Sequence, residues 1–256
     1  MVSKTFIVIS VSDRVNELNN LIESIKRQPK FDEYDINLIY QDYLGNKDKI
    51  KYKERYKNIF YYPNKLGCHG ARVQLLKDLF DSGQAYDIYI NLDDDMELVE
   101  QTRYDGAINK CLERGVGFVL TNWAKSEKIL ENKIPNMCEK FIKQVMVYQG
   151  GGMVYSQKIA MLMKDLPVCH AEFDDIWCMT SYINGYDNYR YLGSLAIHRV
   201  CHSGGMRTYM REKIRPLLCK DYINYRVGKN GFEVLIPDDS DINEHAKELH
   251  KLNYKG

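Results

Sequence analysis

The sequence of 256 residues lacks features that mark several classes of protein. Its apolar runs are all shorter than the ~18 residues that a membrane-spanning helix needs. The opening MVSKTFIVISVSDRVNE passes from apolar to charged residues without a small-residue cleavage site, so we expect no signal peptide. The formal net charge of +1 favours neither an acidic nor a basic partner, so any basic patch must be local.

The chain has seven cysteines, and no two of them have C-x-x-C spacing. Their odd number and wide separation argue against a disulfide framework or a zinc site, and favour reduced thiols in a cytoplasmic protein. Only six prolines stand against 20 tyrosines. Tyrosine-rich clefts often hold polar, ring-shaped ligands, although tyrosines are also common on strands.

The first half of the chain alternates between strand and helix patterns. Runs of apolar, β-branched and aromatic residues predict strands over residues 5–11, 34–42, 58–63, 86–92 and 116–123. Apolar residues at helical spacing predict helices over residues 14–28, 69–83 and 101–115. Repeated strand–helix–strand units predict an α/β fold with a mostly parallel, Rossmann-like sheet and helices on both faces.

The second half is less regular. We predict a strand, a glycine turn and a helix over 146–163, an acidic-headed helix over 171–186, and one or two short strands that run into a loop over 189–205. Residues 207–229 are basic and predicted to be helical, and a short terminal helix follows. Because no linker, repeat or low-complexity run divides the chain, we expect one domain over 1–256.

Polar residues follow every predicted strand of the first half. Ligands of parallel α/β sheets bind beyond the carboxyl ends of the strands. The residues at those ends are Ser12 with Asp13, Asp42, Asn64, Asp93 to Asp95, and Asn122 with Trp123. This edge of the sheet is therefore the expected ligand site.

The stretch YDIYINLDDDMEL, residues 86–98, places three aspartates directly behind a buried strand. Adjacent carboxylates repel each other and resist ionising near an apolar core unless a cation joins them. Asp93 and Asp95 can converge on one divalent ion, and oxygen ligands favour Mg²⁺ or Mn²⁺. The spacing that follows excludes an EF-hand loop. The alternative is a solvated acidic turn before a helix.

The ordered series of strand exits resembles the GT-A nucleotide-sugar glycosyltransferases: Asp42 after the second strand, NKLGCHGAR over 64–72, and the D-x-D motif. The chain is most similar to the inverting family 2 and, in its second half, to the β-1,4-galactosyltransferases, over about residues 4–206. The resemblance implies metal-dependent sugar transfer from a nucleoside-diphosphate donor to an acceptor hydroxyl. It also implies a nucleotide-sugar-binding half (1–123), an acceptor and catalytic half (124–206) and a basic C-terminal, acceptor-side extension (207–256).

In that family the nucleotide base lies over the first two strand ends, where a carboxylate such as Asp42 can accept the imide N–H of uracil. The family's N-x-G-x-x-x-A-R segment matches Asn64 to Arg72, and a guanidinium suits either a pyrophosphate or the aspartate run; a surface arginine is the alternative. QGGGMVYS (149–156) resembles the glycine pair at the junction of donor and acceptor, or is an ordinary tight turn. The implied donor-binding residues are Ser12, Asp13, Arg14, Asp42, Asn64, Arg72, Asp93, Asp94, Gly151 and Gly152.

AEFDDIW (171–177) resembles the E-D-D-D-I-Y segment of the galactosyltransferases, whose carboxylate takes the proton of the acceptor hydroxyl. Gapless alignment places Phe173 where the family has its catalytic aspartate. We therefore expect Asp174 as the base and Asp175 or Glu172 as a ligand of acceptor hydroxyls, with Glu172 as the other candidate base. Acidic residues in the first turn of a helix are the structural alternative. A retaining mechanism or a non-catalytic sugar binder is the functional one.

The same alignment places His202 on the family's metal-binding histidine. His198 lies four residues earlier and would point to the same face of a regular strand. The expected metal ligands are therefore Asp93, Asp95 and His202, with His198 as the alternative. A lone histidine in a strand is otherwise more often structural.

Residues 207–229 carry seven basic side chains and only two acidic ones. This region is either a solvated helix face or a footprint for phosphates, which would suit a phage-type enzyme that glycosylates hydroxymethylated bases in DNA. Sugar nucleotidyltransferases, another class with acidic metal ligands, carry a glycine-rich segment after the first strand. SVSDRVN at that place has no glycine, which argues against them.

Overall fold

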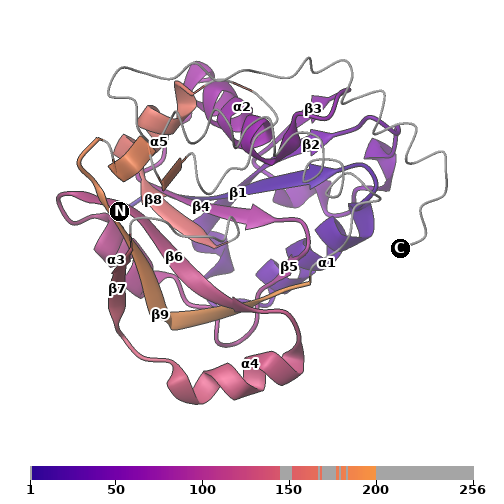
Figure 1. Cartoon of the computed structure of the whole chain (residues 1–256). Helices are drawn as coiled ribbons and strands as arrows, with labels where there is room; N and C mark the ends of the chain where they lie inside the picture. The colour runs from indigo at the N-terminus through magenta and orange to yellow at the C-terminus, as the bar shows by residue number, and fades with distance from the viewer. Residues whose placement is uncertain are drawn as a thin grey trace, which may run out of the picture.

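The computed structural model describes residues 2–144, 152–166, 168, 177–178, 180–182 and 184–199. Within them a nine-stranded sheet has the order β3-β2-β1-β4-β8-β6-β9-β5, with β7 also paired to β9 (Figure 1). The strands are β1 (Lys4–Val11), β2 (Tyr34–Gln41), β3 (Asn58–Tyr62), β4 (Ile88–Asp93), β5 (Met96–Glu97), β6 (Val116–Ala124), β7 (Phe141–Gln144), β8 (Met153–Ser156) and β9 (Asp187–His198). The predicted basic helix over 207–229 lies outside the described residues.

Strands β3, β2, β1 and β4 form the parallel part of the sheet, as predicted. Strand β8 lies antiparallel between β4 and β6, so β4 and β6 run in the same direction. Strand β9 is parallel to β6. The carboxyl ends of β1, β2, β3, β4, β6 and β9 consequently meet at one edge. The insertion of β8 was not predicted from sequence, because the strand expected within 146–163 was placed before the glycines rather than after them.

Helices cover both faces of the sheet (Figure 1). The longer ones are α1 (Val15–Lys26) and α3 (Asp105–Cys111) on one face, α2 (Gly67–Asp81) and α5 (Gln157–Lys164) on the other, and α4 (Glu127–Lys133) at the lower end. Short 3₁₀ turns are η1 (Phe31–Glu33), η2 (Lys47–Lys49), η3 (Lys53–Arg55) and η4 (Ile134–Asn136). Helix α3 is shorter than its predicted range because Thr102 bonds the Val99 N–H and the Leu195 carbonyl, which fixes a turn before it.

The continuous apolar run of β1 is explained by its central place in the sheet. Phe6 and Val8 pack toward α1 and α3, whereas Ile7 and Ile9 pack toward α2 and α5. Successive side chains of a strand point to opposite faces, so a strand covered on both sides needs apolar residues at every position. Full burial of each such side chain contributes about 1.5–3 kcal/mol relative to exposure.

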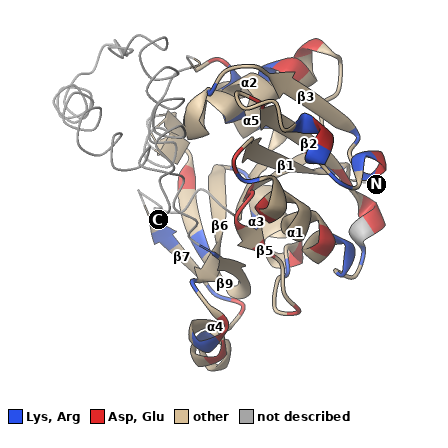
Figure 2. Cartoon of the chain, turned by 90° about the vertical axis from the view of Figure 1, so that its right-hand side faces the viewer, with Lys and Arg blue, Asp and Glu red and all other residues tan. Residues whose placement is uncertain are grey.

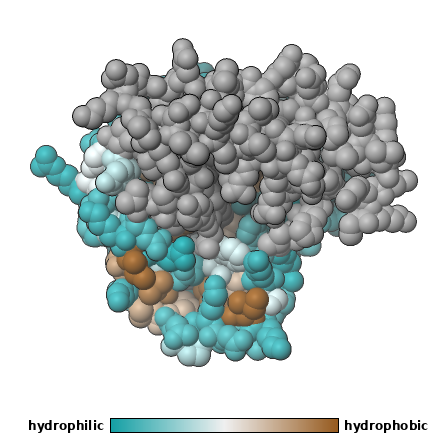
Figure 3. Space-filling model, in the orientation of Figure 1, coloured by the Kyte–Doolittle hydropathy of each residue, from teal (hydrophilic) through white to brown (hydrophobic). Residues whose placement is uncertain are grey.

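On the face seen in Figure 3 the described surface is largely hydrophilic, with separate hydrophobic patches in the lower half of the view. In the view of Figure 2, basic and acidic residues are interspersed over the described elements. None of the described helices has both the length and the apolar character to cross a bilayer.

Candidate metal centre and donor site

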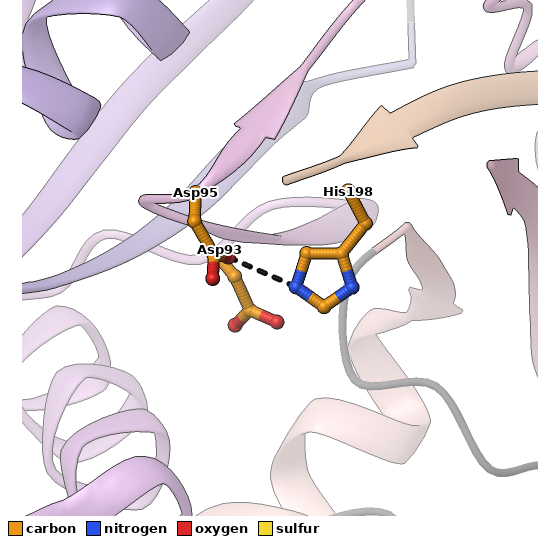
Figure 4. A group of neighbouring side chains, drawn as sticks. All are labelled: Asp93, Asp95 and His198. Atoms are coloured by element: carbon orange, nitrogen blue, oxygen red, sulfur yellow. Dashed lines mark hydrogen bonds and ion pairs between the residues drawn. The ribbon is translucent and has the colours of Figure 1, made fainter. Parts of the chain in front are cut away.

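Three side chains that are far apart in the sequence converge at the carboxyl edge of the sheet (Figure 4). Asp93 ends β4, Asp95 lies in the turn that follows, and His198 ends β9. Met96 of β5 pairs with His198 in antiparallel register, which brings the two ends together. One ligand atom from each of Asp93, Asp95 and His198 lies within 4.8 Å of the others, and His198 Nε2 is 2.9 Å from Asp95 Oδ1.

This geometry fits one octahedral divalent cation. Metal–oxygen distances of about 2.0–2.1 Å place neighbouring ligands roughly 3 Å apart and opposite ones roughly 4 Å apart. The 2.9 Å separation of His198 and Asp95 matches neighbouring ligands, and the 4.8 Å spread needs only a small contraction. His198, the alternative ligand, thus joins the two aspartates; His202 lies outside the described residues.

Asp93, the last residue of β4, and Asp94, the first residue of the following turn, point to opposite faces of the sheet. Asp93 points toward α2, where it accepts a hydrogen bond from Arg72, and Asp94 points toward α1. Asp94 is buried and accepts hydrogen bonds from Ser10 Oγ at 2.9 Å and from a backbone N–H of β1 at 3.3 Å. Asp94 is therefore not part of the cluster that Asp93 and Asp95 form with His198.

Arg14 connects α1 to the aspartate run. Its Nη1 lies 3.1 Å from Asp94 Oδ1 and 3.2 Å from Asp95 Oδ2. Burial raises the pKa of Asp94 to about 7, whereas the adjacent guanidinium opposes that rise. Arg14, expected at the nucleotide base, therefore lies against the aspartates in the described arrangement.

Arg72 is completely buried beneath the metal centre. Its guanidinium donates to Asp93 through Nη2, and to the Cys68 carbonyl at 3.0 Å and Sγ at 2.6 Å through Nη1. The alternative of a surface arginine is thus excluded. The arginine lies beside the aspartate run, one of the two anionic partners expected for it.

The residues at the ends of β1 and β2 shape one turn. Ser12 Oγ accepts the Leu44 N–H at 3.1 Å, and the Ser12 carbonyl accepts from Asn46 Nδ2 at 2.8 Å. Asp42 Oδ1 accepts the backbone N–H of Asn46 at 2.6 Å. Asp13 is exposed beside this turn. Both carboxylates lie where the resemblance places the nucleotide base, and one Asp42 oxygen is already engaged by the backbone.

Sequence reasoning missed three residues beside the donor edge: Gln41, Tyr43 and Lys65. Lys65 is buried, and burial lowers its pKa although the charges of Asp13 and Asp94 act in the opposite direction. Its Nζ lies 5.3 Å from the centre of the Tyr43 ring. Gln41 Oε1 accepts the N–H groups of residues 66 and 67 at 2.6 and 3.1 Å, which fixes the start of α2. The sequence does place Lys65 between Asn64 and Gly67, two residues that match the family segment. The spacing alone, however, does not predict that this lysine is buried.

The remaining candidates are more scattered. Asn64 is exposed at the end of β3. Gly152, with φ +80°, joins β4 to β6 by backbone hydrogen bonds. Trp123 contacts the His198 ring edge-on, with centroids 5.3 Å apart. Five predicted site residues lie outside the described part of the chain: Gly151, Glu172, Asp174, Asp175 and His202.

Comparison with solved structures decides the fold. The mannosyltransferase PcManGT from Pyrobaculum calidifontis, in complex with GDP-Man and Mn²⁺, matches with a TM-score of 0.60 and 15% identity over 97% of this chain and 70% of its own. GalNAc-T7 with UDP, GalNAc and Mn²⁺ matches with a TM-score of 0.58 and 12% identity over 98% of this chain and 55% of its own. The chain has the GT-A fold.

Residues 1–349 of S. aureus TarS share the GT-A fold with this chain at a TM-score of 0.54 and 14% identity, over 98% of this chain and 72% of that structure. By sequence, no family model and no curated protein matches. The GT-A fold predicted from the strand exits is therefore confirmed by three-dimensional similarity. The chain spans little more than half of the GalNAc-T7 structure.

Proposed function

We propose that this chain is a metal-dependent glycosyltransferase that moves a sugar from a nucleoside-diphosphate donor to an acceptor hydroxyl. The observation that carries the proposal is the convergence of Asp93, Asp95 and His198 at the carboxyl edge of a GT-A sheet. Two of the similar structures were solved with Mn²⁺, one with GDP-Man and the other with UDP and GalNAc. That ligand chemistry fits two carboxylates and an imidazole.

Asp93, Asp95 and His198 would hold Mn²⁺ or Mg²⁺. A bound divalent ion stabilises negative charge on the leaving nucleoside diphosphate. Arg14 lies beside this position: its part-exposed guanidinium is 3.2 Å from Asp95. It would keep Asp95 oriented and add positive charge where the diphosphate binds.

The base of the donor would lie over the ends of β1 and β2, against Asp13, Asp42 and Asn64. One oxygen of Asp42 is held by the Asn46 N–H, and the other remains on the side of the carboxylate away from that bond. A fixed carboxylate of this kind suits the imide N–H of uracil, so UDP is the favoured nucleotide. Lys65 would add a positive charge behind the base.

Asp174 would remove the proton of the acceptor hydroxyl as it attacks the anomeric carbon, with inversion of configuration. Glu172 or Asp175 would bind acceptor hydroxyls. Support comes from the segment that follows. Trp177 is buried and its Nε1 donates to His69 Nδ1 at 3.2 Å. His69 lies one turn from Arg72 on α2, so Trp177, which follows the acidic segment in the sequence, packs against the helix that carries Arg72.

The division of the chain follows from this proposal. The donor half, 1–123, ends within β6; the acceptor half covers 124–206; and the basic extension covers 207–256. A glycan is the expected acceptor. The basic side chains of 207–229 support a second candidate, a hydroxymethylated base in DNA, because phosphate contacts come mainly from lysine and arginine.

The test is release of free nucleoside diphosphate from a panel of nucleotide sugars with Mn²⁺ and no acceptor. We expect slow, metal-dependent hydrolysis of one donor. Asp95→Ala should abolish it, whereas Asp48→Ala, at an exposed aspartate of η2, should not. Product from hydroxymethylated DNA but not from glycans would identify the second candidate. Donor binding without turnover, unaffected by Asp174→Asn, would contradict the proposal in favour of a non-catalytic binder.

A further inference from the structure

Arg72 is the most completely buried charged side chain at the centre, with no accessible surface. Arginine is rarely fully buried unless it is paired, because removing its charge from water is costly. Here the guanidinium lies between the second turn of α2 and the end of β4, bonded to Asp93 on one side and to Cys68 on the other. The Cys68 carbonyl belongs to the same helix, so it holds the guanidinium plane relative to α2.

This burial separates Arg72 from direct donor contact. A side chain with zero exposure cannot touch a diphosphate in the described arrangement, whereas Asp93 retains 18% of its side-chain surface. Asp93 lies beside Asp95 and His198 (Figure 4), and one of its carboxylate oxygens accepts a hydrogen bond from Arg72. The contact that links Arg72 to the cluster is therefore its hydrogen bond to the Asp93 carboxylate.

We propose that Arg72 is a positioning residue of the metal centre, which fixes the Asp93 carboxylate in the orientation that completes the Asp93, Asp95 and His198 cluster. The inference rests on the proposed metal-dependent function. Its physical basis is the rigid donor fork of arginine, which determines the plane of a bonded carboxylate, whereas a lysine ammonium is a point charge on a flexible stem. Outer-shell groups of this kind typically change metal affinity about 10-fold to 100-fold.

The direction in which Mn²⁺ affinity changes distinguishes a positioning role of Arg72 from a purely electrostatic one. A cation next to a metal ligand also repels the metal, so removal of its charge alone would tighten binding. Loss of orientation weakens binding instead. Arg72→Lys keeps the charge and removes the fork, and Arg72→Met removes both. If positioning dominates, both variants bind Mn²⁺ about 10-fold to 100-fold more weakly than the natural chain.

The experiment measures the Mn²⁺ dissociation constant of the full chain by electron paramagnetic resonance of free Mn²⁺, without donor or acceptor. Arg27→Lys is the matched control, because Arg27 also pairs with a carboxylate, Glu97 at 3.5 Å, but on the surface. Its affinity should equal that of the natural chain. Circular dichroism and thermal unfolding without metal check that each variant is folded.

Asp93→Asn supplies the decisive cross-check. Because Arg72 acts through Asp93, Arg72→Lys should cause no further loss of affinity in the Asp93→Asn background, which a double-mutant cycle records as a coupling term. If Arg72→Met does not fold, Arg72→Lys and this cycle still decide the question. Should Lys also fail to fold, Cys68→Ala tests the same fork with the arginine retained, and a smaller loss of Mn²⁺ affinity is expected.

Three results would overturn the inference. Unchanged affinity in Arg72→Lys would mean that the fork has no role, and tighter binding in Arg72→Met would make the arginine a competitor of the metal. An equal loss in the Asp93→Asn background would show that the effect does not pass through Asp93. Failure of the proposed function looks different: the natural chain itself would then bind no Mn²⁺, and no variant would be needed to see it.

Discussion

Replacement of Gly152 by alanine tests how the edge beside the metal centre is assembled. The Gly152 N–H donates to the Asn91 carbonyl of β4 at 2.8 Å, and the Gly152 carbonyl accepts from the Thr121 N–H of β6 at 3.1 Å. Asn91 lies two residues before Asp93, and Thr121 two residues before Trp123. Gly152 thus joins β4, which ends in the candidate metal ligand Asp93, to β6, whose Trp123 contacts the candidate ligand His198.

The magnitude follows from two separate costs. The φ of +80° places residue 152 in the left-handed region, which costs a residue with a Cβ about 1–2 kcal/mol. An alanine Cβ at this position would also lie 2.3 Å from Thr121 Oγ1, well inside van der Waals contact. Overpacking of a buried site adds about 1–3 kcal/mol. We therefore expect Gly152→Ala to lower the free energy of unfolding by about 2–5 kcal/mol.

Urea unfolding of Gly152→Ala and of a matched control measures this loss. Gly83→Ala is the control, because Gly83 has a similar φ of +73° and no described atom within 4 Å of the added Cβ, so it should show only the first cost. Thr121→Ala in the Gly152→Ala background should restore part of the stability. If Gly152→Ala costs no more than Gly83→Ala, or if the second change restores nothing, the close approach does not explain the glycine.

Three further predictions concern the site. His198→Ala should weaken Mn²⁺ binding at least about tenfold in isothermal titration calorimetry, since loss of a ligand exceeds the typical loss of its outer partner. Asp94→Asn should lower the free energy of unfolding by about 1–3 kcal/mol, measured in urea. The reason is that the buried Asp94 carboxylate accepts hydrogen bonds from Ser10 and from the charged Arg14, and an amide cannot accept both equally well. Trp177→Phe should cost at least about 1–3 kcal/mol in the same assay, because it removes the N–H that donates to buried His69.

The elements that the sequence predicts best are those with a strong local pattern. Strands β1, β2 and β4 are mainly apolar runs that end in polar residues, and in a parallel sheet this pattern places Asp42 and Asp93 at one edge. The turn before α3 was not predictable, because Thr102 is held by a carbonyl of β9 that is 93 residues away. The place of β8 was missed for a related reason. A four-residue apolar run does not reveal which two strands it separates.

At the site, the sequence predicted which residues take part better than it predicted where their side chains point. The D-x-D spacing identified Asp93 and Asp95 as partners, and the strand period gave His198 as a candidate. Arg14 was assigned to the nucleotide base, yet its guanidinium lies against Asp94 and Asp95, some 80 residues further along the chain. Such a contact depends on how α1 packs beside β4, which the sequence near Arg14 does not encode by itself.

The tolerance of three consecutive aspartates now has a physical explanation. Asp93, at the end of β4, meets Arg72 on the α2 side, whereas Asp94 and Asp95, in the turn that follows, meet Arg14 on the α1 side. Three carboxylates with two guanidinium groups leave one formal negative charge, which disfavours a diphosphate. A divalent ion turns that charge positive. The same arrangement that stabilises the folded chain without metal therefore makes binding of an anionic donor depend on the metal, which is the order that the proposed reaction requires.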